Sequence, residues 1–152
     1  MPLSLATAMV LVLSSLSVLT AALHGNHLAA AELLERQIDD EMASAAEQVA
    51  ARLSGPYSCL LPVASAAWIQ PVTGCPVTLD PAGVLRGQVG QAGYRVVSWK
   101  PPANAMGGEG ESGQLRLEGV ERGGSRLYGL GVALVAQDLP ALHVVSVRRM
   151  GR

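Results

Sequence analysis

The feature that most constrains this chain is a long run without charge near its start. Residues 3–23 contain only apolar side chains, serines and threonines. A helix rises about 1.5 Å per residue, so a run of this length matches the roughly 30 Å hydrocarbon core of a bilayer. The hydroxyls can donate to carbonyls one turn earlier, which makes them tolerable in lipid. We therefore predict a transmembrane helix over residues 1–27.

A cleaved secretory signal peptide is the alternative interpretation of the same run. Ala29, Ala30 and Ala31 would suit a small-residue cleavage site. The apolar run is longer than the usual core of about 7–15 residues in a signal peptide, and no Lys or Arg precedes it. These two features favour a retained anchor. Both interpretations carry the rest of the chain out of the cytoplasm.

A second helical pattern, over residues 28–55, continues directly from the first. Its apolar side chains recur at steps of three and four, which places them on one helix face: Ala31, Leu34, Ile38, Met42, Val49 and Leu53. Acidic side chains dominate the opposite face, whereas basic side chains outnumber acidic ones over residues 56–152. Gly55 and Pro56 would end the helix, because glycine suits a C-cap and proline cannot continue a helix. The pattern predicts an amphipathic continuation that needs a sheet on its apolar stripe.

Residues 56–152 are expected to form a small, loop-rich antiparallel β domain. Alternating side chains predict four strands, after an irregular segment at 56–93, at residues 94–100, 114–122, 126–136 and 142–148. The predicted connections are a glycine loop at 107–113, a tight turn at Gly123-Gly124-Ser125 and a short turn at 138–140. The fold class is therefore α+β: a long N-terminal transmembrane-plus-amphipathic helix packed on a small antiparallel β-meander.

Two expectations about packing follow from the composition of this domain. Aromatic residues make up 3% of the chain and Phe is absent, so the core should be thin and built from Val, Leu, Ile and Ala. In the third predicted strand the small residues Gly129, Gly131 and Ala133 share one face. Small residues would let a helix approach the sheet closely from that side.

Cys59 and Cys75 are the two cysteines of the chain. Outside the cytoplasm, a pair of cysteines in a loop-rich stretch suggests a disulfide. Closing a loop of about 15 residues stabilises a fold by about 3 kcal/mol in the chain-entropy model. Two buried free thiols are the alternative, and a metal site would lack a complete ligand set.

The order of these elements resembles the type IV pilin and pseudopilin family. The resemblance rests on a hydrophobic N-terminal helix, its amphipathic continuation, an irregular connection and a small antiparallel meander, and it covers the whole chain as a layout. The opening Met1-Pro2-Leu3-Ser4-Leu5-Ala6 looks like the start of minor, tip-type members, some of which lack the family's glutamate at the fifth position of the mature chain. If Met1 stood at the cleavage point, Leu5 would take that place.

The resemblance implies a structural subunit that waits in the inner membrane as a single-pass protein, with its C-terminal domain extracytoplasmic, and then packs helix against helix in a filament. Its partners would be other pilin-like subunits and inner-membrane assembly proteins. A subunit without the glutamate would suit a tip or priming position. The residues expected to carry the helix packing are Leu5, Met9, Val12, Leu16, Leu34, Ile38, Met42 and Val49.

Signals for chemistry are weak throughout the chain. His24 and His27 have a spacing that can hold a metal, but the sequence places no further ligand beside them. The serines lack the G-x-S-x-G setting of a nucleophile elbow. We therefore expect no enzyme, no cofactor, no nucleic acid and no small-molecule substrate. The alternatives to a pilin-like subunit are a binding module released from a signal peptide, or a membrane protein that uses residues 28–53 as a coiled-coil partner.

Overall fold

The chain begins with one long helix, α1 (Pro2–Ser54), in a computed structural model that describes residues 2–76, 79–103, 112–121, 123–135 and 141–151. Ala and Leu dominate the helix, and no proline follows Pro2 until Pro56. Proline suits the first helical position because its missing N–H needs no partner there. The helix ends as predicted: the Gly55 N–H donates to the carbonyl of Arg52 at 3.1 Å, and Pro56 follows.

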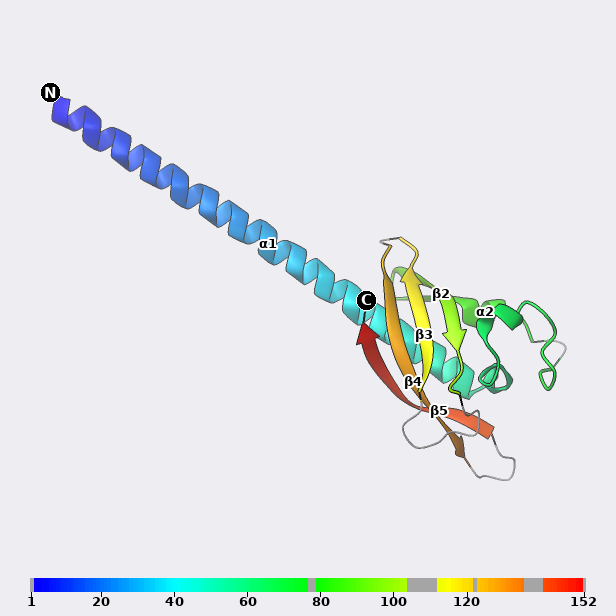
Figure 1. Ribbon diagram of the computed structural model, residues 1–152. Helices are drawn as coiled ribbons and strands as arrows, with labels where there is room; N and C mark the ends of the chain where they lie inside the picture. The colour runs from blue at the N-terminus through cyan, green and yellow to red at the C-terminus, as the bar shows by residue number, and fades with distance from the viewer. Residues whose placement is uncertain (1, 77–78, 104–111, 122, 136–140, 152) are drawn as a thin grey trace. The chain divides into compact units, whose positions relative to one another are not determined.

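The chain divides into two compact units, Met1–Asp39 and Asp40–Arg152. The first unit consists of the N-terminal part of α1. The second contains the last turns of α1 and all the strands, so the amphipathic segment of the helix is shared between the two units. In Figure 1 these last turns of α1 lie beside the sheet within the second unit.

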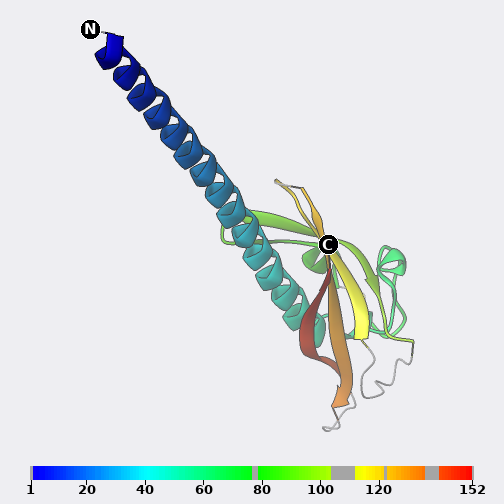
Figure 2. The ribbon, with the colours of Figure 1, turned by 60° about the vertical axis from the view of Figure 1, so that its left-hand side comes forward.

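The second unit is built around one five-stranded antiparallel sheet, whose strands follow one another in sequence order. The strands are β1 (Arg86–Val89), β2 (Ala92–Lys100), β3 (Ser112–Gly119), β4 (Ser125–Val135) and β5 (Ala141–Gly151). Figure 2 shows this curled sheet from a second direction. The predicted α+β class and the antiparallel meander are confirmed.

The sheet has one more strand than the alternation of side chains predicts. Strand β1 and the short helix α2 (Ala82–Leu85) before it were expected to be irregular. The four residues of β1 include Gly87, and two of them are exposed, so the pattern of side chains barely marks the strand. Strand β3 begins at Ser112, inside the predicted glycine loop. Residues 107–111 of that loop and the predicted turn at 138–140 lie outside the described residues.

The tight turn between β3 and β4 is confirmed. Gly123 has a φ of +64° and Gly124 a φ of +83°, in the left-handed region that glycine enters without the strain of a β-carbon. The carbonyl of Gly124 accepts from the Gly119 N–H at 3.3 Å. These two glycines let β4 return directly alongside β3.

The core lies between the last turns of α1 and one sheet face, here called the inner face. Met42, Val49 and Leu53 are at most 5% exposed on the helix. The largest fully buried side chains, however, are aromatic: Trp68, Trp99, Tyr94 and Tyr128. The prediction of a core of Val, Leu, Ile and Ala is therefore wrong, because neither Ile38 nor Ile69 is buried and the few aromatic residues of the chain are concentrated in the interior.

Glycines make room for these rings. A β-carbon on Gly87 would overlap the ring of Tyr94, its cross-strand partner, and one on Gly113 would overlap the Trp99 ring. The rings thus lie directly over glycine backbone on neighbouring strands. This arrangement lets a large ring cover two strands at once, and it ties the aromatic positions to the glycine positions.

The expectation that a helix lies on the glycine side of β4 is wrong. A β-carbon on Gly131 would overlap the hydroxyl of Ser146, and one on Gly129 would lie 3.0 Å from the sulfur of Met150. These glycines therefore face side chains of the neighbouring strand β5. The α1 side is the opposite one, where Tyr128 and Leu130 of β4 are buried.

Candidate assembly helix and its anchorage

The N-terminal unit presents large apolar side chains that nothing in the described chain covers. Met9 is 64% exposed, Val12 56%, Leu16 56% and Leu23 53%. Contiguous exposed apolar surface of this kind is rare on soluble monomers and marks a site for lipid or for a protein partner. Within the described residues, α1 is long and apolar enough to cross a membrane. The predicted transmembrane helix is consistent with this finding.

The hydroxyl side chains of this segment have partners inside the helix. Ser14 Oγ donates to the carbonyl of Val10 at 2.8 Å, and Thr20 Oγ1 donates to that of Leu16 at 2.8 Å. Ser15 and Ser17 make the same kind of bond, each at 2.9 Å, to the carbonyl three residues earlier. Unpaired polar groups cost several kcal/mol in hydrocarbon. These four hydroxyls therefore do not prevent the helix from lying in lipid.

The structure separates the predicted helix-packing residues into two groups. Met9, Val12, Leu16 and Leu34 are exposed and available for contacts with lipid or with another helix. Met42 and Val49 are 5% and 0% exposed, because the inner face of the chain's own sheet covers them. Ile38 is half-buried, and the side chain of Leu5 lies outside the described part.

The segment between the apolar run and the β domain is amphipathic and exposed. Leu28 and Leu33 are each 66% exposed and Leu34 is 48% exposed. Glu32 accepts an ion pair from Arg36 one turn later at 2.9 Å, with both side chains largely exposed. An exposed pair of this kind contributes about 0.3–0.5 kcal/mol to the helix. The segment therefore combines an uncovered apolar stripe with an acidic edge.

Side chains of the last turns of α1 hold the β domain at three points. The Tyr94 hydroxyl donates to Oε1 of Gln48 at 2.8 Å. Ser54 Oγ accepts the backbone N–H of Val144 at 2.8 Å. Arg52 donates from Nη1 to the carbonyl of Gly83 and, at 3.3 Å, to that of Arg86. Sequence reasoning missed all three residues of α1, because they belong to the polar side of the helix pattern.

Tyr94 is the described side chain whose ionisation the fold clearly changes. Burial raises the pKa of its phenol above the ordinary value of 10.0, because the phenolate would lose hydration. The positive charge of Arg52 acts in the opposite direction and is the smaller effect. Tyr94 therefore stays neutral, and its hydroxyl can donate to Gln48 throughout the neutral range.

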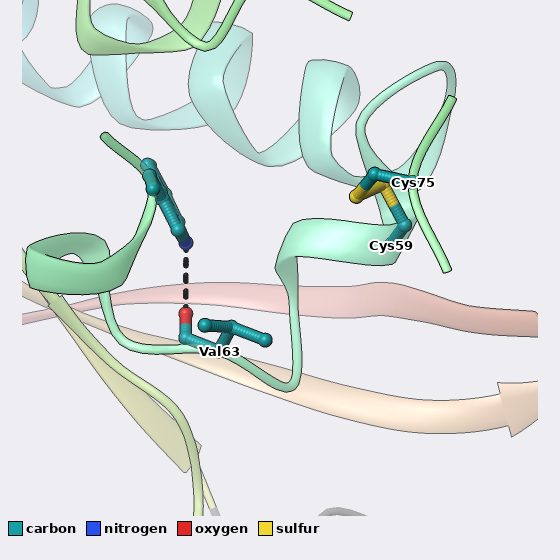
Figure 3. The surroundings of a disulfide bond; sticks show 4 residues. Cys59, Val63 and Cys75 are labelled. Carbon is teal, nitrogen blue, oxygen red and sulfur yellow. Dashed lines mark hydrogen bonds between the residues drawn. A yellow bond between two sulfur atoms is a disulfide. The ribbon is translucent and has the colours of Figure 1, made fainter. Parts of the chain in front are cut away.

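The segment after α1 is fixed by a disulfide and by two indole hydrogen bonds. Cys59 and Cys75 form the predicted disulfide, with Cα atoms 5.4 Å apart. Trp68 donates its indole N–H to the carbonyl of Val63 at 2.9 Å (Figure 3). Trp99 of β2 donates to the carbonyl of Leu61 at 3.0 Å. The disulfide therefore joins the two ends of a segment whose middle is attached to the sheet.

Two hollows lie on the β domain. The first, of about 430 Å³, is in the disulfide segment and is lined by Trp68, Ile69, several prolines and their neighbours. The second, of about 410 Å³, lies between the last turns of α1 and strand β5, and we call it the α1–β5 groove. Its lining is Glu47, Ala50, Ala51, Ser54, Val144, Val145, Ser146 and Val147. The groove is thus mainly apolar, with one carboxylate.

The described residues hold no cluster of three or more His, Cys, Asp or Glu side chains that could bind a metal ion. His24 and His27 both lie on the exposed part of α1, within the first unit. The carboxylates of the amphipathic segment lie on an exposed helix face, and Glu32 is already paired with Arg36. The arrangement therefore offers surfaces for packing rather than a centre for catalysis.

The layout of a long apolar N-terminal helix and an antiparallel sheet is compatible with a pilin-like architecture. No protein-family model, no curated protein and no solved structure matches the chain.

Proposed function

We propose that this protein is a membrane-anchored structural subunit that assembles with other subunits through its N-terminal helix. The observation that carries the proposal is the uncovered apolar surface of α1, on which Met9, Val12 and Leu16 are all more than half exposed. The internal hydrogen bonds of Ser14 and Thr20 support it, because the helix can enter lipid without unpaired hydroxyls.

The particular kind of subunit that we propose is a minor pilin or pseudopilin. Support comes from the pilin-like layout and from the firm attachment of the last turns of α1 to the sheet through Gln48 and Ser54. In such a subunit the same helix serves first as a membrane anchor and then as a packing element in a filament. Leu5, at the place of the family's glutamate if Met1 is the first residue of the mature chain, would favour a tip or priming position.

The proposed cellular arrangement is a single span in the inner membrane with the β domain outside the cytoplasm. The disulfide between Cys59 and Cys75 supports this orientation, because disulfides persist in oxidising compartments. The role is mechanical and involves no cofactor. The partners would be pilin-like subunits and inner-membrane assembly proteins.

Membrane extraction of the full chain tests the anchor. We expect it to resist alkaline carbonate. Leu16→Arg should reduce the resistant fraction, because an arginine in the middle of a membrane span costs about 2.5–3.5 kcal/mol. Leu33→Arg is the matched control: Leu33 is 66% exposed on the same helix but lies among charged residues beyond the apolar run. Equal extraction of the two variants would contradict the anchor.

Mass spectrometry of the mature N-terminus tests retention of the helix. We expect a hydrophobic terminus that is intact or N-methylated. A chain that begins near Ala31 or Glu32 would instead indicate a released binding module. Assembly is tested by purifying the full chain from detergent extracts of its native host. Recovery of no filament or assembly component would count against the pilin-like role even if the anchor is real.

A further inference from the structure

The α1–β5 groove is an uncovered apolar surface on the compact β domain. Val145 in its wall is 61% exposed, and Ala51 and Ser146 are also exposed. Val145 is the extra residue of a β-bulge, since Gly131 pairs with Ser146 and the next residue, Val132, pairs with Val144. A bulge re-aims a side chain and interrupts the edge of a sheet. Strand β5 is an edge strand, so its outer side has no neighbouring strand.

The charges around the groove are arranged asymmetrically. Arg148 and Arg149 follow Val147 directly along β5, and both are exposed. Glu47, the groove's carboxylate, lies on the α1 side. A helix that enters the groove with an acidic edge would therefore be attracted toward β5 and repelled from α1. The groove consequently selects both the charge and the orientation of what it binds.

The amphipathic segment of α1 has the complementary pattern. Leu34 is 48% exposed and belongs to its apolar stripe. Glu35 and Asp39, spaced four apart, lie beside this stripe on one side of the helix. The segment thus has an apolar face for the groove and an acidic edge for the two arginines of β5.

We propose that the α1–β5 groove binds the 28–39 segment of a second copy of this chain, with Leu34 against Val145 and with Glu35 and Asp39 toward Arg148 and Arg149. The inference rests on the proposed function and deepens it by naming the contact between subunits. Two copies related in this way leave one groove and one segment free. The contact is therefore heterologous, and it can propagate in one direction as a filament requires.

Cysteine cross-linking between two differently tagged full-length chains tests the contact. One chain carries Leu34→Cys and the other Val145→Cys, so a cross-link at the combined mass must join two copies. Background is low, because the two native cysteines are paired with each other. The matched control replaces Val145→Cys with Val97→Cys on β2, since Val97 is also exposed, at 47%.

We expect the Leu34–Val145 pair to cross-link and the Leu34–Val97 pair to give several-fold less product. Arg148→Glu with Arg149→Glu should lower the yield roughly threefold to tenfold, the range for two exposed ion pairs. Glu35→Arg with Asp39→Arg in the other chain should restore it. Raising the salt concentration should lower the yield in chains that keep all four charges. Equal cross-linking to Val97, or no response to either charge or salt, would overturn the proposal.

A second cross-link separates this inference from the proposed function. Leu16→Cys in both chains reports contact between the membrane helices of two copies. If the Leu16 pair cross-links and the Leu34–Val145 pair does not, the groove contact is wrong and helix-mediated assembly stands. If neither pair cross-links in the native membrane, self-assembly and the groove contact fail together.

Discussion

The hydroxyl of Tyr94 on β2 donates a 2.8 Å hydrogen bond to the side-chain oxygen of Gln48 on α1. The bond joins the polar margin of the helix to the buried face of the sheet. It connects residues 46 positions apart in the chain, so it forms only when the helix and sheet have come together. It is therefore a sensitive point at which to test how the β domain is attached to its helix.

We expect Tyr94→Phe to destabilise the β domain by about 1 kcal/mol, because Gln48 loses a neutral hydrogen-bond donor in a partly buried setting. Chemical denaturation of the full chain in detergent, followed by Trp fluorescence, measures this change. Gln48→Leu should cost a similar amount, and the double variant should cost less than the sum of the two. Strictly additive costs would show that the bond does not contribute to stability.

Stability should fall at alkaline pH in a way that depends on Tyr94. Its pKa in the folded chain is raised above 10.0 by burial, so the folded state favours the neutral phenol. The resulting stabilisation is present below about pH 10 and is lost as the pH rises through the higher pKa of the folded state. The free energy of unfolding, compared at about pH 8 and about pH 11, should drop less in Tyr94→Phe than in the parent chain. An identical drop would contradict this prediction.

Loss of the disulfide should loosen the segment after α1. We expect Cys59→Ser with Cys75→Ser to cost about 3 kcal/mol, because the open chain of the unfolded state regains its loop entropy. Urea denaturation compares the double serine variant with the parent chain. Reduction of the parent chain by a strong thiol should have the same effect and no further effect on the variant, which provides the control. An unchanged unfolding midpoint would mean that the indole bonds of Trp68 and Trp99 suffice to hold this segment.

A side chain at Gly113 should be strongly destabilising. The Trp99 ring occupies the space that a β-carbon would need, and Trp99 is 1% exposed with its indole N–H bonded to Leu61. We expect Gly113→Ala to cost about 1–3 kcal/mol through overpacking and to shift the Trp fluorescence. Gly151→Ala is the matched control, because nothing lies within 4 Å of a β-carbon there. Equal effects of the two substitutions would exclude the overlap with the ring as the cause.

Local patterns in the sequence predict much of this fold. The uncharged run, the apolar stripe and the Gly55-Pro56 end define α1 to within about a residue, because a helix is built from contacts between near neighbours. Alternation of side chains identifies β2 through β5, and Gly123 with Gly124 identifies a turn, because each signal lies within a few consecutive residues. The disulfide was also predictable, because the chain has two cysteines and a context that suits their oxidation.

Tertiary structure decides what these patterns leave open. Strand β1 is a strand because β2 pairs with it and because the ring of Tyr94 covers Gly87. Gln48, Arg52 and Ser54 hold the β domain through bonds to residues at least 31 positions away, which spacing along a helix cannot indicate. The stripe on α1 reads the same at Leu34 as at Val49, yet the first is exposed and the second is buried. The physical reason is that periodicity fixes which way a side chain points, whereas burial depends on what distant part of the chain, or which partner, lies opposite.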